Sequence, residues 1–427
     1  MSVTAAAGFR AAGVTAGLKA SGRPDLALIV NDGPDAAAAA VFTTNTVLAA
    51  PVLWSRQVLA GGEVRAVVLN SGGANACTGA PGFQDAHATA AAVGAALEIS
   101  AGEVAVCSTG LIGVRLPMDR LLPGVGAAVA ALGAGGGADA AEAICTTDTV
   151  SKQATVSKQA TVSKQAAVSK QATVSKQATV SKQATMSKQA AVSKQATAGG
   201  EGWTVGGMAK GAGMLAPALA TMLVVVTTDA QAAADDLDRA LRAATAQTFD
   251  RVDTDGCMST NDTVLLLASG ASGISPPYAE LERAVTDVCA NLARQLVADA
   301  EGASKEIAIE VTGAADEADA LAAARAVARS ALFKCAVHGE DPNWGRVLAA
   351  IGTTPARFDP YRVDVSFNGA PVCSDGVAAG GPGDARVALK PRYIHVVVDL
   401  HAGAASATVL TTDLTADYVH ENSAYST

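Results

Sequence analysis

Residues 216–229 read APALATMLVVVTTD, and the fold and the chemistry of the chain are best approached from this stretch. From Met222 to Thr227 it is a run of apolar and β-branched residues of strand length, which predicts a buried strand. Thr221 stands at the head of this run, directly after the small residue Ala220. A cut between these two residues would give Thr221 a free α-amine, whose ordinary pKa of about 8 suits a general base beside its own hydroxyl. A threonine that merely opens a core strand explains the same pattern.

Strand-like runs alternate with helical patterns along the rest of the chain, which predicts a layered α/β or α+β fold. The clearest helix is expected over residues 278–300, where apolar residues recur at i, i+3 and i+4. With 427 residues the chain is long enough for one large domain or two closely packed ones. Further strands are expected at Leu26–Val30, Val64–Asn70, Glu103–Cys107, Ile307–Val311, Arg362–Phe367, Ile394–Leu400 and Ala407–Thr411.

Composition and charge exclude several classes of protein. Half of the residues are apolar but only 4% are aromatic, so small side chains are expected to fill a closely packed core. The net charge of -9 argues against a nucleic-acid partner. Neither a disulfide framework nor a metal site is indicated, because the seven cysteines are scattered and no histidine has metal-ligand spacing. No apolar run is long enough to span a bilayer, so a cytoplasmic protein with no membrane partner is expected.

A hexapeptide repeat interrupts this pattern. From Ser151 to Ala198 the sequence SKQATV and its near-copies recur eight times. Six residues advance a helix by about 600°, so the valines form no helical stripe. In a strand the even period would place Lys, Ala and Val on one face, and a lysine in every such trio argues against burying that face. We therefore interpret residues 151–198 as a flexible, basic insertion that rests on the acidic body, with a β-coil or partial helix as alternatives.

Three glycine-rich segments follow apolar runs, at residues 69–79, 106–113 and 205–214. Glycines after a strand let backbone N–H groups approach a ligand or a developing oxyanion, although they also make ordinary turns. Lys210 lies in the third segment, but the order of a phosphate-binding loop is absent. This lysine fits either a carboxylate-binding role or a position at the surface. The polar segment at residues 338–346, HGEDPNWGR, is compatible with a rigid capped loop and equally with part of a functional site.

Motifs spread over nearly the whole chain resemble those of the glutamate N-acetyltransferase/ornithine acetyltransferase family. They include VVLNSGGANACTG, CSTGLIG, TTDT, GGMAKGAGMLAP, FDRVDTDGCMSTNDT, EGASK, KCAVHGEDPNWGRVL and YVHENSAYST. The resemblance implies an α/β fold of the layered DOM type, related to N-terminal-nucleophile enzymes. It also implies self-cleavage between Ala220 and Thr221, which gives an α chain of residues 1–220 and a β chain of residues 221–427. An α2β2 heterotetramer is expected on the same basis.

The resemblance also assigns roles to individual residues. Thr221 is expected to take the acetyl group from N2-acetylornithine and to pass it to glutamate in a ping-pong cycle of arginine biosynthesis. The Thr109 side chain and the backbone of Gly110 are expected to form the oxyanion hole. Acetyl-CoA is a possible co-substrate, and no other cofactor is expected. Residues expected to bind substrate are Thr146, Lys210, Thr221, Glu301, Asn422 and Thr427.

Two other functions remain open from the sequence. The same nucleophile would act as a self-processed amidase or aminopeptidase if water replaced the acceptor amine. The repeats could instead belong to a scaffold protein that retains an inactive enzyme body. Within the resemblance, relatives carry a single short T-D-T-x-x-K-Q stretch where this chain has eight copies. The sequence does not show which copy takes the usual position, so the geometry around Thr146 is left open.

Overall fold

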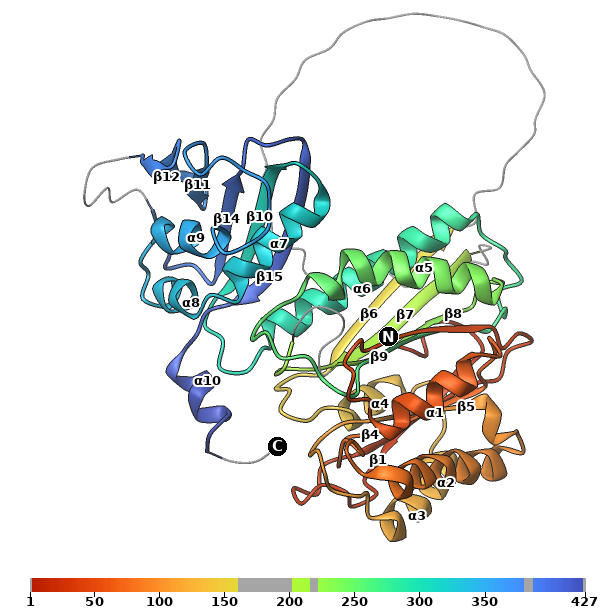
Figure 1. Ribbon diagram of the computed structural model, residues 1–427. Helices are drawn as coiled ribbons and strands as arrows, with labels where there is room; N and C mark the ends of the chain where they lie inside the picture. The colour runs from red at the N-terminus through yellow and green to blue at the C-terminus, as the bar shows by residue number, and fades with distance from the viewer. Residues whose placement is uncertain (1, 160–201, 216–221, 380–386, 425–427) are drawn as a thin grey trace, which may run out of the picture.

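The computed structural model describes residues 2–159, 202–215, 222–379 and 387–424. Two lobes are visible in Figure 1. The chain up to α6 (Tyr278–Ala298) forms a larger body, and the chain from β10 (Glu306–Ala314) onward forms a smaller lobe. The strands of the body belong to two sheets, and those of the smaller lobe form a third. A layered α/β fold, as predicted, is therefore observed.

The first sheet of the body has four strands in the order β1-β2-β4-β5. β4 and β5 are parallel, and the other neighbours are antiparallel. Helix α1 protects the edge at β5, because the Ser55 hydroxyl donates to the Val106 carbonyl at 2.7 Å and accepts its N–H at 2.9 Å. The elements are β1 (Phe9–Val14), β2 (Leu26–Asn31), β4 (Ala66–Asn70), β5 (Val104–Ser108), α1 (Ala50–Leu59), α2 (Gly79–Leu97), η1 (Ala101–Glu103), α3 (Met118–Ala130) and α4 (Gly137–Ala143).

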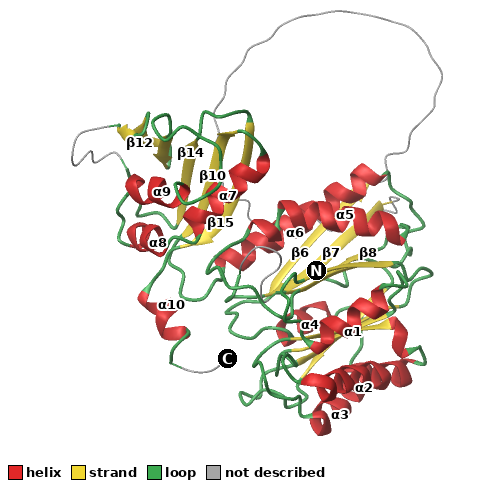
Figure 2. Ribbon diagram, in the orientation of Figure 1, coloured by secondary structure: helices red, strands yellow, loops and turns green. Residues whose placement is uncertain are grey.

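The second sheet has five strands in the order β3-β9-β8-β7-β6. One of its faces shares a core with the four-stranded sheet, and its other face packs on α5 and α6. Figure 2 shows the resulting order of helices, sheet, sheet and helices. The elements are β3 (Ala38–Phe42), β6 (Lys152–Gln159), β7 (Gly202–Lys210), β8 (Leu223–Thr228), β9 (Thr263–Ala268), α5 (Ala234–Gln247), η2 (Phe249–Arg251) and α6 (Tyr278–Ala298).

Strand β8 lies in the middle of this arrangement, and all six of its residues are buried. Leu223 and Val225 face the four-stranded sheet, whereas Val224 and Val226 face α5 and α6. Both faces of the strand are covered, which explains why its sequence is continuously apolar. The strand predicted from residues 222–227 is therefore confirmed at the centre of the fold.

The smaller lobe is a six-stranded sheet in the order β13-β12-β11-β14-β10-β15. Its core includes residues of α7, α8 and α9. Figure 1 shows these helices beside the sheet. The segment 338–346 runs from the last residue of α8 through the connecting loop 339–343 into the first turn of α9, and the Asn343 side chain caps α9. The elements are β10 (Glu306–Ala314), β11 (Asp364–Phe367), β12 (Ala370–Ser374), β13 (Val377–Ala378), β14 (Tyr393–Asp399), β15 (Ala405–Thr412), α7 (Glu317–Ala328), α8 (Ala331–His338), α9 (Trp344–Ile351) and α10 (Ala416–Glu421).

Two expectations from the sequence are wrong. Gly206 and Gly207 of the third glycine-rich segment lie within strand β7 and not after a strand. The flexible insertion is wrong for Lys152–Gln159, which form β6 and pair with β7 in antiparallel register. A buried lysine is tolerated there because Lys152 is paired with two aspartates. Repeat residues after 159 lie outside the described part of the chain.

Glycines in β7 allow close packing on both sides of the sheet. A Cβ on Gly206 would lie 2.2 Å from the backbone oxygen of Ser2, and one on Gly207 would lie 3.0 Å from Val288 of α6. Small residues, as predicted from the composition, are thus required where the β7 backbone lies close to a neighbouring backbone or side chain.

We predict that Gly206→Ala lowers the free energy of unfolding by about 1–3 kcal/mol, because the added methyl overlaps a backbone atom. The matched control is Gly126→Ala in α3, where a Cβ meets nothing within 4 Å. That change should stabilise the protein by about 0.5–1 kcal/mol. Urea unfolding of both variants measures the difference, and equal stabilities would contradict the packing argument.

Candidate active site

The candidate site lies where strands of both body sheets begin or end. β4 and β5 end at Asn70 and Ser108, and β7 ends at Lys210. β8 and β9 start opposite that end of β7, as the pairing of Lys210 with Leu223 and of Leu223 with Thr263 shows. Polar side chains at the ends of neighbouring strands are thereby brought together at the junction of the two sheets.

Thr109 and Gly110 follow β5 at this junction. Thr109 is buried and forms an isolated bridge with Gly73 of the glycine-rich loop after β4. Gly110 has φ of +130°, and a Cβ there would lie 2.8 Å from the Gly73 nitrogen, so only glycine fits. Within the described residues no acceptor is found for the Gly110 N–H. A backbone N–H at such a position is the kind of donor that an oxyanion hole requires.

Asn261 ties the two loops of this region together. Its Nδ2 donates to the Ala74 oxygen at 2.6 Å and to the Ser108 oxygen at 2.8 Å. The side chain is buried two residues before β9 begins, so the segment that leads into β9 holds the loops that carry Thr109 and Gly110. This positioning role could not be inferred from the sequence, since the contacts join segments far apart in the chain.

Lys210 is fully buried at the end of β7. Its Nζ donates to the Thr109 Oγ1 at 3.2 Å, which places these two predicted site residues in direct contact. Burial lowers the pKa of the lysine below its ordinary value, and the nearby Asp148 carboxylate opposes that change. The interpretation of Lys210 as a surface residue is excluded, and its cation can pair with an anionic ligand.

Thr146 is held close to Lys210 by Asp148. The Asp148 Oδ2 accepts the Thr146 N–H at 3.0 Å, and Oδ1 accepts the N–H of Gly211 at 2.7 Å. Burial alone would raise the pKa of Asp148, but the charges of Lys210 and Lys152 and the Gly211 N–H hold it at about 2. Asp148 is therefore an anion that the sequence interpretation missed, although it stands inside the quoted TTDT motif.

Glu301 and Asn422 meet on the far side of the loop after Lys210. The Glu301 Oε1 accepts a hydrogen bond from the Thr147 hydroxyl at 2.7 Å, and Oε2 accepts one from the Asn422 Nδ2 at 3.1 Å. The Glu301 N–H donates to the Ala212 oxygen at 2.9 Å. The carboxylate of Glu301 is thus adjacent to the loop that carries Lys210.

Asp262 is a second buried carboxylate that the sequence interpretation missed. Its Oδ1 accepts the N–H of Met222 at 2.9 Å, and its Oδ2 has no hydrogen-bond partner among the described residues. Burial raises its pKa well above the ordinary value. Ala220, Thr221 and Thr427 lie outside the described residues, but the Met222 nitrogen is covalently bonded to Thr221. The chain therefore enters β8 beside Asp262 and Lys210.

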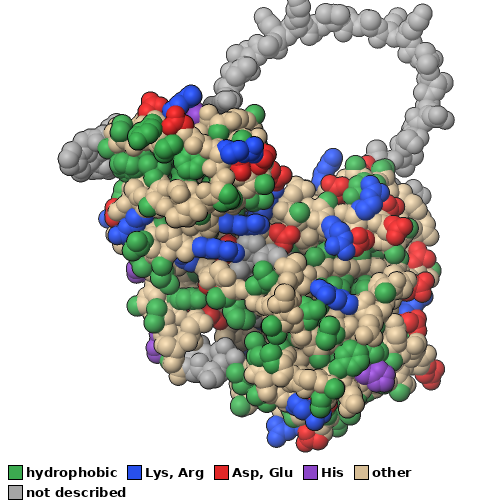
Figure 3. All heavy atoms as spheres, in the orientation of Figure 1, with side chains coloured by type: hydrophobic (Ala, Val, Ile, Leu, Met, Phe, Trp, Pro, Cys, Tyr) green, Lys and Arg blue, Asp and Glu red, His purple; other side chains and the backbone are tan. Residues whose placement is uncertain are grey.

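A cavity of about 390 Å³ adjoins this cluster, and Thr147, Glu301 and His420 are part of its lining. Small ligands of mixed charge suit such a volume. On the face shown in Figure 3, Lys and Arg side chains are scattered along the boundary of the two lobes. Within the described ranges no cluster of metal-binding side chains is found, and no helix is long and apolar enough to cross a membrane.

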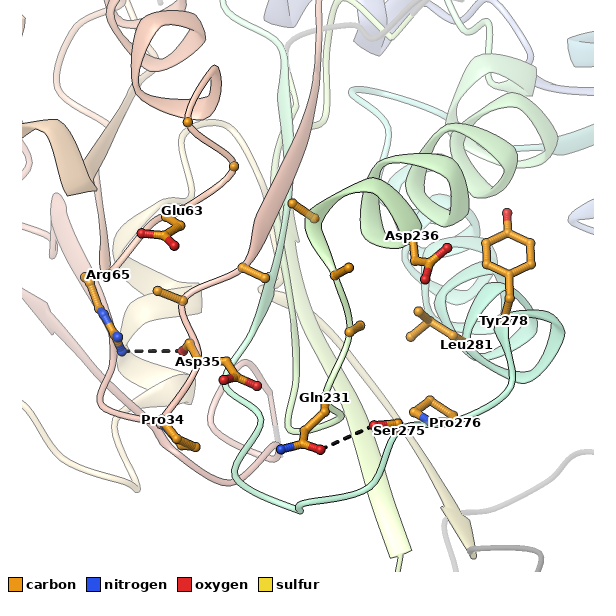
Figure 4. A pocket seen from close by; sticks show the side chains of 17 residues that line it. Pro34, Asp35, Glu63, Arg65, Gln231, Asp236, Ser275, Pro276, Tyr278 and Leu281 are labelled. Atoms are coloured by element: carbon orange, nitrogen blue, oxygen red, sulfur yellow. Dashed lines mark hydrogen bonds between the residues drawn. The ribbon is translucent and has the colours of Figure 1, made fainter.

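Figure 4 shows a larger cavity, of about 690 Å³, that lies elsewhere. Gln231 lines it and follows the far end of β8, whereas the candidate site lies at the start of that strand. The Arg65 side chain donates to the backbone oxygens of Gly33 and Asp35, so the guanidinium is engaged by the protein itself. None of the predicted site residues that the structure describes lines this cavity.

The layered fold and the cluster of buried cations, carboxylates and backbone donors at the strand ends define an enzyme of the layered α/β class. Known proteins identify it further. "Arginine biosynthesis bifunctional protein ArgJ" of Streptomyces coelicolor is 59% identical over 428 residues, covering 100% of both chains. The protein of the same name from Thermobifida fusca is 58% identical over 427 residues, again with full coverage of both.

Two solved structures are also similar in sequence to part of the chain. An ornithine acetyltransferase of Mycobacterium tuberculosis, solved in complex with ornithine, is 54% identical; the match covers 51% of this chain and 94% of that one, with a TM-score of 0.40. The ArgJ structure from Bacillus halodurans is 35% identical. The match covers 47% of this chain and 98% of that one, with a TM-score of 0.45. The chain matches the ArgJ family over residues 10–176 and 165–427. It belongs to the ArgJ family.

The depressed pKa of Asp148 predicts a specific acid sensitivity. Because its pKa is about 2 in the folded state and about 3.9 when unfolded, its ionised form stabilises the protein above pH 4. That contribution, about 2 kcal/mol, is lost as the pH falls from about 4 to about 2. Urea unfolding at several pH values should show this loss in the parent and not in Asp148→Asn. Asp238→Asn, which removes one partner of an exposed ion pair, is the control, and its free energy of unfolding should have the same pH dependence as that of the parent. The same pH dependence in the parent and in Asp148→Asn would contradict the assignment.

Proposed function

We propose that the chain is an acetyltransferase of arginine biosynthesis that moves the acetyl group of N2-acetylornithine to glutamate. The proposal is supported by membership of the ArgJ family and by one observation above all. Lys210 contacts Thr109 at 3.2 Å at the end of β7, beside the place where the chain passes from Thr221 into β8. A threonine nucleophile, a cation and backbone donors are the parts that acyl transfer to and from a small amino acid needs.

The chemistry begins with self-cleavage. The Thr221 hydroxyl attacks the carbonyl carbon of Ala220, and the peptide nitrogen leaves as the α-amine of Thr221 once it has taken a proton. The resulting ester is hydrolysed by water, which gives the carboxylate of Ala220 and restores the hydroxyl. A free amine and a hydroxyl then share one residue, and the unperturbed pKa of an α-amine, about 8, suits a general base.

Acetyl transfer uses the same atoms twice. The Thr221 oxygen attacks the acetyl carbonyl of N2-acetylornithine, its proton passes through the α-amine to the departing nitrogen, and ornithine leaves. The α-amine of glutamate then attacks the acetyl ester and N-acetylglutamate leaves. Both tetrahedral intermediates carry an oxyanion, which the Thr109 hydroxyl and the Gly110 N–H stabilise.

Substrate recognition follows from charge. N2-acetylornithine has a carboxylate at one end and an ammonium at the other. The buried cation of Lys210 pairs with the carboxylate, and Glu301 pairs with the ammonium. Thr146, Asn422 and Thr427 complete the pocket as further polar partners.

The second donor that we propose is acetyl-CoA, which would load the same threonine; the word bifunctional in the names of the relatives supports it. Self-processing into α and β chains, assembly as α2β2 and a place in the cytoplasm complete the proposal. Incubating the purified protein with acetyl-CoA and glutamate, in the absence of acetylornithine, tests the second donor by the appearance of free thiol.

Replacing the nucleophile gives the most direct test. We predict that Thr221→Ala abolishes cleavage, so that a denaturing gel shows one full-length band in place of two fragments of about half its length. Acetyl transfer from N2-acetylornithine to glutamate should fall by at least about 10³-fold, as it does when a catalytic nucleophile is removed. The control Thr228→Ala removes a buried hydroxyl at the other end of β8 and should leave both cleavage and transfer in place.

Ornithine release, measured with and without glutamate, distinguishes transfer from hydrolysis. A transferase releases ornithine at a sustained rate only with glutamate present and otherwise stops after one equivalent. Equal sustained rates in both conditions would establish the amidase alternative and contradict the proposed function. An unbroken chain that transfers acetyl groups at the full rate would contradict the role of Thr221.

A further inference from the structure

The sequence KCAVH, residues 334–338, contains a buried lysine to which the acetyl-transfer mechanism assigns no role. Lys334 lies on α8 of the smaller lobe and is 6% exposed. Its Nζ donates to the backbone oxygen of Thr254, which belongs to the larger body. Burial lowers the pKa of the lysine, and the nearby carboxylates of Asp255 and Asp253 oppose that change. Lys334 thus joins the smaller lobe to a loop of the body.

That loop holds a turn at residues 212–215. The Thr254 N–H donates to the Leu215 oxygen at 2.5 Å, and the Thr254 hydroxyl donates to the same oxygen at 3.2 Å. The Asp255 Oδ2 accepts the N–H of Met214 at 2.7 Å. Met214 has φ of +53°, a left-handed conformation that is uncommon for a residue with a side chain and persists where its surroundings support it. The contacts with Thr254 and Asp255 supply that support.

The same turn packs against Glu301. The Glu301 N–H donates to the Ala212 oxygen at 2.9 Å. Gly213 lies so close to the carboxylate that a Cβ on it would be 2.4 Å from the Glu301 Oε2. A displaced turn would therefore change the position of the Glu301 side chain. Lys334 acts on Glu301 through Thr254 and this turn.

We propose that Lys334 is a positioning residue for the ammonium end of the substrate, because it holds Thr254 and thereby fixes the turn at residues 212–215 against Glu301. The proposal rests on the proposed function, in which Glu301 pairs with the ammonium of N2-acetylornithine. A charged donor makes a stronger hydrogen bond to a carbonyl oxygen than a neutral one, so the ammonium suits this task. α8, which carries none of the predicted substrate-binding residues, then takes part in substrate recognition.

Lys334→Met removes the ammonium and keeps an unbranched side chain. We expect kcat/KM for N2-acetylornithine to fall by at least about tenfold, mainly through KM, because the substrate ammonium no longer meets a fixed carboxylate. N-acetylnorvaline has the same carbon chain without the ammonium, so its kcat/KM should change by less than about threefold. Lys334→Gln, which can donate to the Thr254 oxygen, should recover part of the loss. Equal losses with the two substrates would overturn the positioning role.

Lys305→Met is the matched control. Lys305 is 7% exposed, and its Nζ donates to the backbone oxygens of residues 389–391. These acceptors belong to the smaller lobe, so the control loses an equally buried ammonium and keeps the contacts of the turn at residues 212–215. The ratio of kcat/KM for the two substrates should stay within about twofold of the parent ratio. A fall as large as that in Lys334→Met would show that lost stability is the cause, and the proposal would be rejected.

Amide hydrogen exchange supplies a readout that does not depend on activity. The N–H groups of Met214 and Thr254 are hydrogen-bonded, and both should exchange faster in Lys334→Met than in the parent or in Lys305→Met. Unchanged exchange at both positions would overturn the hold of Lys334 on the turn. If Lys334→Met does not fold, Thr254→Val replaces it; this variant removes the hydroxyl donor to Leu215, and a smaller loss in the same direction is expected.

The two proposals fail in different ways. A parent that transfers no acetyl group, or that does not distinguish N2-acetylornithine from N-acetylnorvaline, would contradict the proposed function. The exchange rates of Met214 and Thr254 would still decide whether Lys334 holds the turn. A parent that prefers N2-acetylornithine, together with a Lys334→Met variant that keeps the full preference, would contradict the positioning role alone.

Discussion

The arrangement of the candidate site depends on a buried network of two lysines and two aspartates. Asp148 accepts a hydrogen bond from Lys152 and is stabilised by the charge of Lys210, and Lys152 also contacts Asp299. Each charge would be costly on its own in the interior, so each is stable only while the others are in place. Because the four residues come from β6, β7 and the segments before Thr149 and Glu301, the network fixes the relative positions of these elements. The geometry at Thr109 follows, since Lys210 contacts it directly.

Close packing of backbones allows such a network to form at the junction of two sheets. Gly110 approaches Gly73, and Gly213 lies so near Glu301 that a Cβ would be 2.4 Å from its Oε2. Side chains at these positions would separate the loops and admit water between the charges, which would weaken their attraction. The high content of small residues, noted in the sequence as a property of the core, therefore also serves the electrostatics of the site.

Much of the fold could be predicted from the sequence, because buried strands and amphipathic helices have periodic patterns. The helix from Tyr278 and the strand after Thr221 are observed where they were expected. The burial of Lys152 was not predicted, because a single sequence gives no sign that two aspartates, one of them 147 residues away, neutralise its charge. Asn261 and Asp262 were missed for the same reason, since their partners are distant in sequence. The resemblance placed Thr109 and Lys210 in one site, and the structure shows their contact; the role of Thr221 remains a prediction.

The position of the repeat explains how a chain can carry eight copies without losing the site. Gln159 pairs with Gly202, so the two ends of the additional segment lie side by side at the end of a hairpin. Lengthening such a connection costs entropy that grows only with the logarithm of its length, about 0.6 kcal/mol for each doubling. Growth from a connection of a few residues to one of several tens thus costs roughly 2 kcal/mol, which a large domain tolerates. The same additions placed between Asp148 and Lys152 would separate the two charges that the site requires, so the sequence can expand on one side of β6 and not on the other.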